Sequence, residues 1–113
     1  MKKQYRTLIS ALGLFLLMAG TALAKDIVIF NGADFAIERI YMSDSDDDGW
    51  GDDLLNGEML APGEGLKITI SGTPDNLDLS LYDDEDQELI FHQLDFTDFE
   101  SLTVFNDGTG RFE

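Results

Sequence analysis

The residues best suited to chemistry lie in one short acidic segment, residues 44–53. Six of its ten residues are aspartate, and the only tryptophan of the protein, Trp50, lies between two glycines. So many carboxylates in one loop repel each other unless water, salt or a bound cation relieves the repulsion. Cation binding is therefore the first chemistry to consider.

The spacing of these aspartates matches the first half of an EF-hand-type calcium loop. Carboxylates two residues apart in a curled loop can converge on one ion, and a glycine at the sixth position, here Gly49, allows the sharp turn. The ligands predicted from this spacing are four carboxylates and one backbone carbonyl: Asp44, Asp46, Asp48, Trp50 and Asp52.

The closing ligand of that motif is missing. A bidentate glutamate is expected at the twelfth position, where this chain has Leu55, and the flanking helices are absent as well. Asp53, Glu58 or a second acidic turn at residues 83–86 could supply the ligand through the fold. Two interpretations stay open: a specific Ca2+ site and a solvated acidic loop without a ligand.

Trp50 also has two interpretations. As a structural residue it caps one open end of a β-sandwich, with Leu54 and Leu55 packed beneath it. As a functional residue it stacks on a sugar or a peptide.

No catalytic constellation is apparent in the sequence. The chain has no cysteine, and its one histidine, His92, has no serine motif to complete a triad. With 23 acidic residues, a pair of carboxylates carries no information about glycosidase chemistry. We therefore do not expect an enzyme, and we expect His92 at an outward or rim position.

The N-terminus has the pattern of a cleaved export signal. Positive residues lie within residues 2–6, an apolar run covers residues 8–18, and an Ala-Leu-Ala triplet at residues 22–24 matches a cleavage site. Residues 1–24 are therefore predicted to be a signal peptide, and residues 25–113 a single exported domain, periplasmic or extracellular. We expect no membrane insertion of the mature chain.

The charge of the mature domain limits its partners. The formal net charge of the whole chain is −16, and it becomes −19 without residues 1–24, which hold three basic residues and no acidic one. Nucleic acid and anionic membrane surfaces are excluded as partners because both would be repelled. A divalent cation or another positively charged group is the partner that this field attracts.

The pattern of the mature chain is all-β. Residues 66–71 and 77–82 alternate cleanly between apolar and polar side chains, and residues 35–43 fit a strand with a bulge near residues 38–39. Turn signals separate strands expected to begin near residues 26, 37, 58, 66, 77, 88 and 101, and residues 111–113 are expected to fray. The predicted fold is a small antiparallel β-sandwich of about seven strands, immunoglobulin-like.

Three motifs resemble a known family. They are Tyr-x-Ser at residues 41–43, Trp-Gly-x-x-Leu-Leu at residues 50–55 and Leu-x-Pro-Gly at residues 60–63. As an ordered set they are similar to those of a small secreted bacterial β-sandwich family of unknown function, over residues 27–104. The resemblance implies a sandwich and export, and no activity. The family loop is usually richer in serine, so the resemblance implies no cation site.

These observations favour an exported non-catalytic binding or structural module of the cell envelope, with Ca2+ as its candidate cofactor. The alternative is a protein- or carbohydrate-binding β-sandwich whose acidic surface serves only solubility or salt adaptation. An envelope or extracellular protein would then be the partner, bound at a sheet edge or an aromatic rim. Phe96, Phe99 and Phe105 are the candidates for that rim.

Overall fold

The computed structural model describes residues 6–12, 24–47 and 49–113, and these form strands and turns. The strands are β1 (Arg6–Leu12), β2 (Ala24–Asn31), β3 (Ile37–Asp44), β4 (Gly65–Ser71), β5 (Leu77–Asp83), β6 (Glu88–Leu94), β7 (Ser101–Val104) and β8 (Gly110–Phe112). In this part of the chain, no helix is long and apolar enough to cross a membrane.

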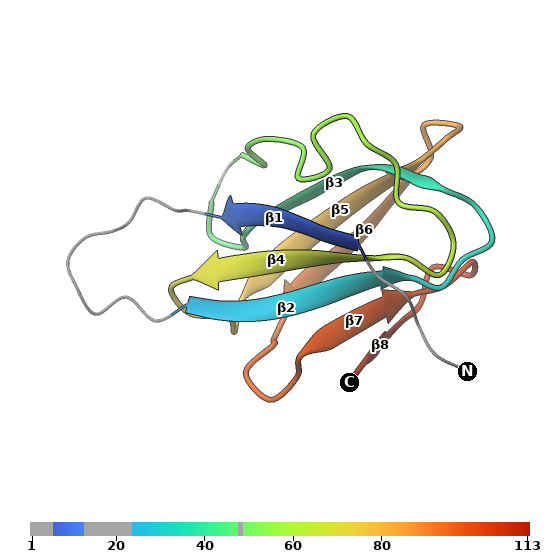
Figure 1. Cartoon of the computed structure of the whole chain (residues 1–113). Coiled ribbons are helices and arrows are strands. Elements are labelled where there is room, and N and C mark those ends of the chain that lie inside the picture. The colour runs from blue at the N-terminus through green and yellow to red at the C-terminus, as the bar shows by residue number, and fades with distance from the viewer. Residues whose placement is uncertain (1–5, 13–23, 48) are drawn as a thin grey trace.

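The strands form two sheets, one in front of the other in Figure 1. The larger sheet has the order β1-β4-β2-β7-β8, and the smaller sheet has the order β3-β5-β6. Strands β2 to β8 therefore form an all-β domain of seven strands, four in one sheet and three in the other. This agrees with the predicted class and number of strands.

One hydrophobic core lies between the sheets because alternate side chains of each strand point inward. The alternation predicted for residues 66–71 and 77–82 is confirmed. Its inward side chains are all buried: Leu66, Ile68, Ile70, Leu77, Leu79 and Leu81. The bulge predicted near residues 38–39 is confirmed as well, since the pairing of β3 with β5 shifts register between Ile37 and Arg39.

The prediction of a purely antiparallel sandwich is wrong for the larger sheet. β2 runs parallel to β7, with Ile29 opposite Leu102, and antiparallel to β4. Apolar alternation reports which face of a strand is buried and is silent on the direction of its neighbour. Parallel neighbours need a long connection, and here the whole run from β3 to β6 supplies it.

Two local predictions are also wrong. The strand expected near residue 58 is reduced to one bridge, in which the backbone N–H groups of Ile37 and Leu60 each donate to the carbonyl of the other residue. The C-terminal residues do not fray, because β8 pairs with β7 and the Phe112 ring packs against Phe96 at 5.2 Å and Phe99 at 4.8 Å.

β1 lies within the predicted signal peptide and pairs in parallel with β4. The other residues of that segment, 1–5 and 13–23, lie outside the described residues. Export, cleavage and the domain start at Lys25 therefore stay predictions.

A buried amide joins the end of β2 to the neighbouring loops. Asn31 is fully buried, and its Nδ2 donates to the carbonyls of Phe35 at 2.8 Å and Leu60 at 3.0 Å. Its Oδ1 accepts from the N–H of Ala33 at 2.9 Å. A buried amide is inexpensive only when it is paired in this way. The sequence had indicated only a turn here.

Candidate functional site

The acidic loop starts with a turn capped by its own first carboxylate. Asp44 ends β3, and its Oδ1 accepts from the N–H of Asp46 at 3.0 Å, while its carbonyl accepts from the N–H of Asp47 at 2.9 Å. Aspartate favours turns because its side chain can bond the backbone two residues on. One carboxylate oxygen of Asp44 is thus already used in a hydrogen bond that shapes the loop.

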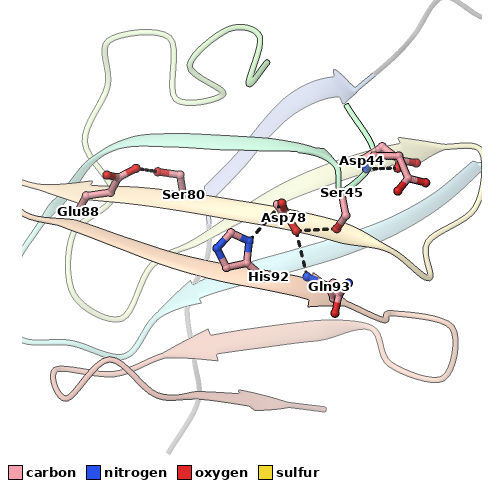
Figure 2. Close-up of polar contacts among 8 residues, drawn as sticks. Asp44, Ser45, Asp78, Ser80, Glu88, His92 and Gln93 are labelled. Atoms are coloured by element: carbon pink, nitrogen blue, oxygen red, sulfur yellow. Dashed lines mark hydrogen bonds and ion pairs between the residues drawn. The ribbon is translucent and has the colours of Figure 1, made fainter. Parts of the chain in front are cut away.

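The first end of the loop is anchored to β5 and its preceding turn. The N–H of Ser45 donates to the carbonyl of Asn76 at 2.9 Å. The Ser45 Oγ donates to Asp78 Oδ1 at 2.5 Å, as Figure 2 shows. This contact joins residues 33 positions apart in the chain.

Asp78 also holds the neighbouring strand β6. Its Oδ1 accepts from the N–H of Gln93 at 3.0 Å, and its Oδ2 lies 3.3 Å from His92 Nδ1 (Figure 2). Gln93 has a φ of 56°, and the register of β5 and β6 shifts beside it, so the carboxylate secures a β-bulge. The hydrogen bond from Ser45 is the main reason that the pKa of Asp78 lies below its ordinary value, and the contacts with Gln93 and His92 add to it.

The second end of the loop is anchored to β3. Asp53 Oδ1 accepts from the N–H groups of Ile40 and Leu55, both at 3.0 Å. The N–H of Leu54 donates to the carbonyl of Ile40 at 2.7 Å. Leu54 and Leu55 are buried in the core. The loop therefore returns along β3 and is pinned there.

A hollow of about 340 Å³ opens beneath the loop. Asp44, Asp47 and Trp50 line it, together with residues 71–73 at the end of β4 and in the turn after it. Trp50 is half-buried, and Gly51 after it has a φ of 80°, which glycine adopts without strain. The loop end of the domain thus has an acidic hollow with an aromatic wall.

The predicted calcium ligands are distributed as follows. Asp44 is half-buried, Asp46 and Asp52 are exposed, and Trp50 is half-buried beside them in the chain. Asp48 lies outside the described residues. Among the residues that are described, no three acidic or histidine side chains are grouped closely enough to hold a metal ion. The five-ligand set therefore stays a prediction.

The second acidic turn cannot supply the missing ligand. Asp83 pairs with Ile37 at the start of β3, whereas Leu77 pairs with Asp44 at its end. A strand rises roughly 3.3 Å per residue, so residues 83–86 lie on the order of 20 Å from Asp44, the first predicted ligand. Of the three suggested sources, the turn at residues 83–86 is therefore excluded. Asp53 is already used as an anchor.

The predicted aromatic rim is only partly accessible. Phe96 is fully buried in the core, so its assignment to a binding rim is wrong. Phe99 is 37% exposed and stacks on Phe112 at a centroid distance of 4.8 Å. Phe105 is half-buried, with the Arg111 guanidinium 5.4 Å from its ring centroid.

The outer face of the smaller sheet carries a second aromatic group, which the sequence reading missed. Tyr41 and Tyr82 meet edge to face at 6.1 Å, and the Arg39 guanidinium lies 4.2 Å from the Tyr82 centroid. Ile90 on β6 is 40% exposed and pairs with Ser80 on β5.

The comparisons with family models, curated proteins and solved structures return no match to the chain. The resemblance to the small secreted family therefore rests on its three motifs, and the site is interpreted from its own geometry.

Proposed function

We propose that this protein is an exported, non-catalytic binding module with an immunoglobulin-like sandwich, and that its acidic loop holds Ca2+. The observation that carries the proposal is the double anchoring of the loop. Ser45 is tied to Asp78 at one end, and Asp53 is tied to the Ile40 amide at the other. These contacts fix the two ends of the acidic segment, whose carboxylates repel one another unless a cation relieves the repulsion.

Anchoring matters because binding must offset the cost of ordering the ligand groups. A loop that is already fixed at both ends loses less freedom when an ion binds. The hollow lined by Asp44, Asp47 and Trp50 leaves room for water ligands, which Ca2+ accepts among its six to eight oxygens. Without the bidentate glutamate, we expect a dissociation constant of roughly 10⁻⁴–10⁻³ M, as in weak extracellular sites.

Thermal unfolding tests this proposal. Ca2+ at about 100 times its dissociation constant adds about 2.7 kcal/mol to the free energy of unfolding. For a domain of this size, the melting temperature should rise by roughly 10–20 °C. The comparison includes EDTA, Mg2+, and NaCl at matched ionic strength. An equal rise with NaCl would mean simple screening of charge and would end the calcium proposal.

A matched pair of variants locates the ion. Asp46→Asn combined with Asp48→Asn removes two loop carboxylates, while Asp84→Asn combined with Glu85→Gln removes two carboxylates from the turn at the other end of β3. The first pair should abolish the shift with Ca2+, and the second should preserve it. If both pairs reduce the shift equally, the effect comes from net charge and not from a site.

A second function is favoured by the outer face of the smaller sheet. The Tyr41–Tyr82 pair with Arg39 offers ring faces and a guanidinium to an extracellular protein or a carbohydrate. Under this alternative, the acidic surface serves solubility or salt adaptation. NMR titration with a panel of oligosaccharides checks the carbohydrate arm, in which the amides of Tyr41 and Tyr82 should shift. Shifts confined to residues 44–53 would argue against this face.

A further inference from the structure

A second cavity, of about 190 Å³, opens at the opposite end of the domain. Ile37 at the start of β3 and Leu81 near the end of β5 line it. Asp44 and Leu77, at the other ends of the same strands, line the hollow beneath the acidic loop. The two cavities are therefore separate, and a ligand in one does not reach the other.

The lining of this cavity is mainly hydrophobic and comes from both sheets. Phe35, Leu89 and Phe105 line it and are only half-buried, so solvent reaches their apolar surfaces. Ile37 and Val104 are buried beneath them. A ligand with a hydrocarbon body would remove this apolar surface from water, which is favourable.

The volume of the cavity limits the size of the ligand. A cavity of roughly 150 Å³ accepts benzene, whereas drug-sized ligands need roughly 300–1,000 Å³. A volume of about 190 Å³ therefore suits one ring with a short chain.

The charge beside the cavity also limits which ligands can bind. Asp83 lines the cavity, and its Oδ1 accepts from the N–H groups of Glu85 at 2.8 Å and Gln87 at 2.9 Å, so the turn holds the carboxylate in place. Acidic residues fill the rest of this turn, at positions 84–86, and Arg39 is paired with Asp86 at 2.7 Å. This field favours a cation and repels an anion.

A wall of the cavity already contacts a cation. The Arg111 guanidinium lies 5.4 Å from the Phe105 ring centroid, within the range of cation–π attraction. Arg111 is itself paired with Glu113 at 3.6 Å, which offsets its charge. Phe105 therefore contributes apolar surface to the cavity, and the preference for a positively charged group comes from Asp83 and the acidic turn that follows it.

We propose that this cavity binds a small organic amine with a hydrocarbon body of one ring. The ring lies among Phe35, Leu89 and Phe105, and the ammonium group pairs with Asp83 at the mouth. This site is independent of the calcium proposal, since the acidic loop takes no part in it.

The test is an NMR titration of the purified protein with three compounds of the same body and different charge. They are 2-phenylethylamine (positive), 2-phenylethanol (neutral) and 3-phenylpropionate (negative). The amine should bind best and the anion worst, and the shifted amides should lie in residues 35–37, 81–89 and 104–108. Asp83→Asn should weaken amine binding roughly two- to fivefold, as expected for an exposed ion pair, and leave the alcohol unchanged.

Two further variants complete the test. Asp84→Asn makes the same charge change beside the cavity without altering its lining, so it should weaken amine binding less than Asp83→Asn does. Leu89→Phe narrows the cavity from a half-buried position and should weaken binding of both the amine and the alcohol. Equal affinities for amine and alcohol would overturn the proposal, as would equal weakening by Asp83→Asn and Asp84→Asn. The comparison of Asp83→Asn with Asp84→Asn tests the proposal even if Leu89→Phe does not fold.

Discussion

Replacing Asp78 should loosen the first end of the acidic loop and the adjoining bulge of β6. This carboxylate is 16% exposed and accepts hydrogen bonds from Ser45 Oγ at 2.5 Å and from the N–H of Gln93 at 3.0 Å. Asp78→Ala removes both acceptors, whereas Asp78→Asn keeps one side-chain oxygen and loses the charge. The two variants therefore separate the hydrogen bonds from the electrostatics.

The expected magnitudes follow from these contacts. A hydrogen bond to a charged group contributes about 1.5–3 kcal/mol, and water can reach the freed donors of Ser45 and Gln93 in part. Asp78→Ala should therefore lower the free energy of unfolding by about 3 kcal/mol, and Asp78→Asn by about 1 kcal/mol. The larger loss corresponds to a fall in melting temperature of roughly 10–25 °C.

The pH dependence gives a second, independent check. The pKa of Asp78 is lowered in the folded protein, chiefly by Ser45, so the carboxylate contributes stability above its unfolded pKa of about 3.9. That contribution is lost as the pH falls from this value through the folded pKa. The gap between the wild type and Asp78→Asn should be present at neutral pH and should narrow as the pH falls below about 4.

Urea unfolding from pH 3 to pH 7 measures both effects. Asp84→Asn serves as the control, because Asp84 is exposed and lies at the other end of the smaller sheet. A double-mutant cycle with Ser45→Ala should show that the two losses are not additive. A gap as large at pH 3 as at pH 7, or an Asp78→Ala variant as stable as the wild type, would refute the role assigned to this carboxylate.

Four other substitutions probe single contacts, each measured by chemical unfolding. Asn31→Ala should cost about 2–4 kcal/mol, because it removes the side-chain partner of the Ala33 N–H and of the Phe35 carbonyl. Gly32→Ala should cost about 1–3 kcal/mol, since its Cβ would lie 2.9 Å from the carbonyl oxygen of Val104. Gln93→Val should cost about 1–3 kcal/mol at a φ of 56°, whereas Gln93→Gly should be tolerated. Asp53→Ala should cost about 1–2 kcal/mol, because two backbone N–H groups lose their acceptor. In limited proteolysis, the same variant should be cleaved faster within residues 46–52. Unchanged cleavage would argue against the anchoring role of Asp53.

Much of the local structure could be predicted from the sequence because it follows from local rules. Strands β4 and β5 alternate with a period of two, and that period alone identifies their inward residues. The acidic loop was likewise recognised between two apolar segments, with Leu54 and Leu55 as its buried anchor. These features depend on residues a few positions apart.

The anchors of the candidate site could not be predicted in the same way. Asp78 stands in an alternating strand exactly as a solvent-facing residue would, and its bond to Ser45 depends on the pairing of β3 with β5. Asp53 is one of six aspartates in its segment, and only its position beside the Ile40 amide distinguishes it. A carboxylate becomes an anchor through its neighbours in space.

The amino-acid sequence by itself determined the all-β class, the two best strands and the charge that a partner must complement. Tertiary structure decided that β2 and β7 run parallel, that the two acidic turns lie at opposite ends of β3, and that a cavity opens beside Asp83. The physical reason is that burial and turn preferences act on neighbouring residues, so they produce a periodic pattern of residue types in the sequence. Strand order and cavities depend on contacts between distant segments, and the acidic loop acquires its form from those contacts.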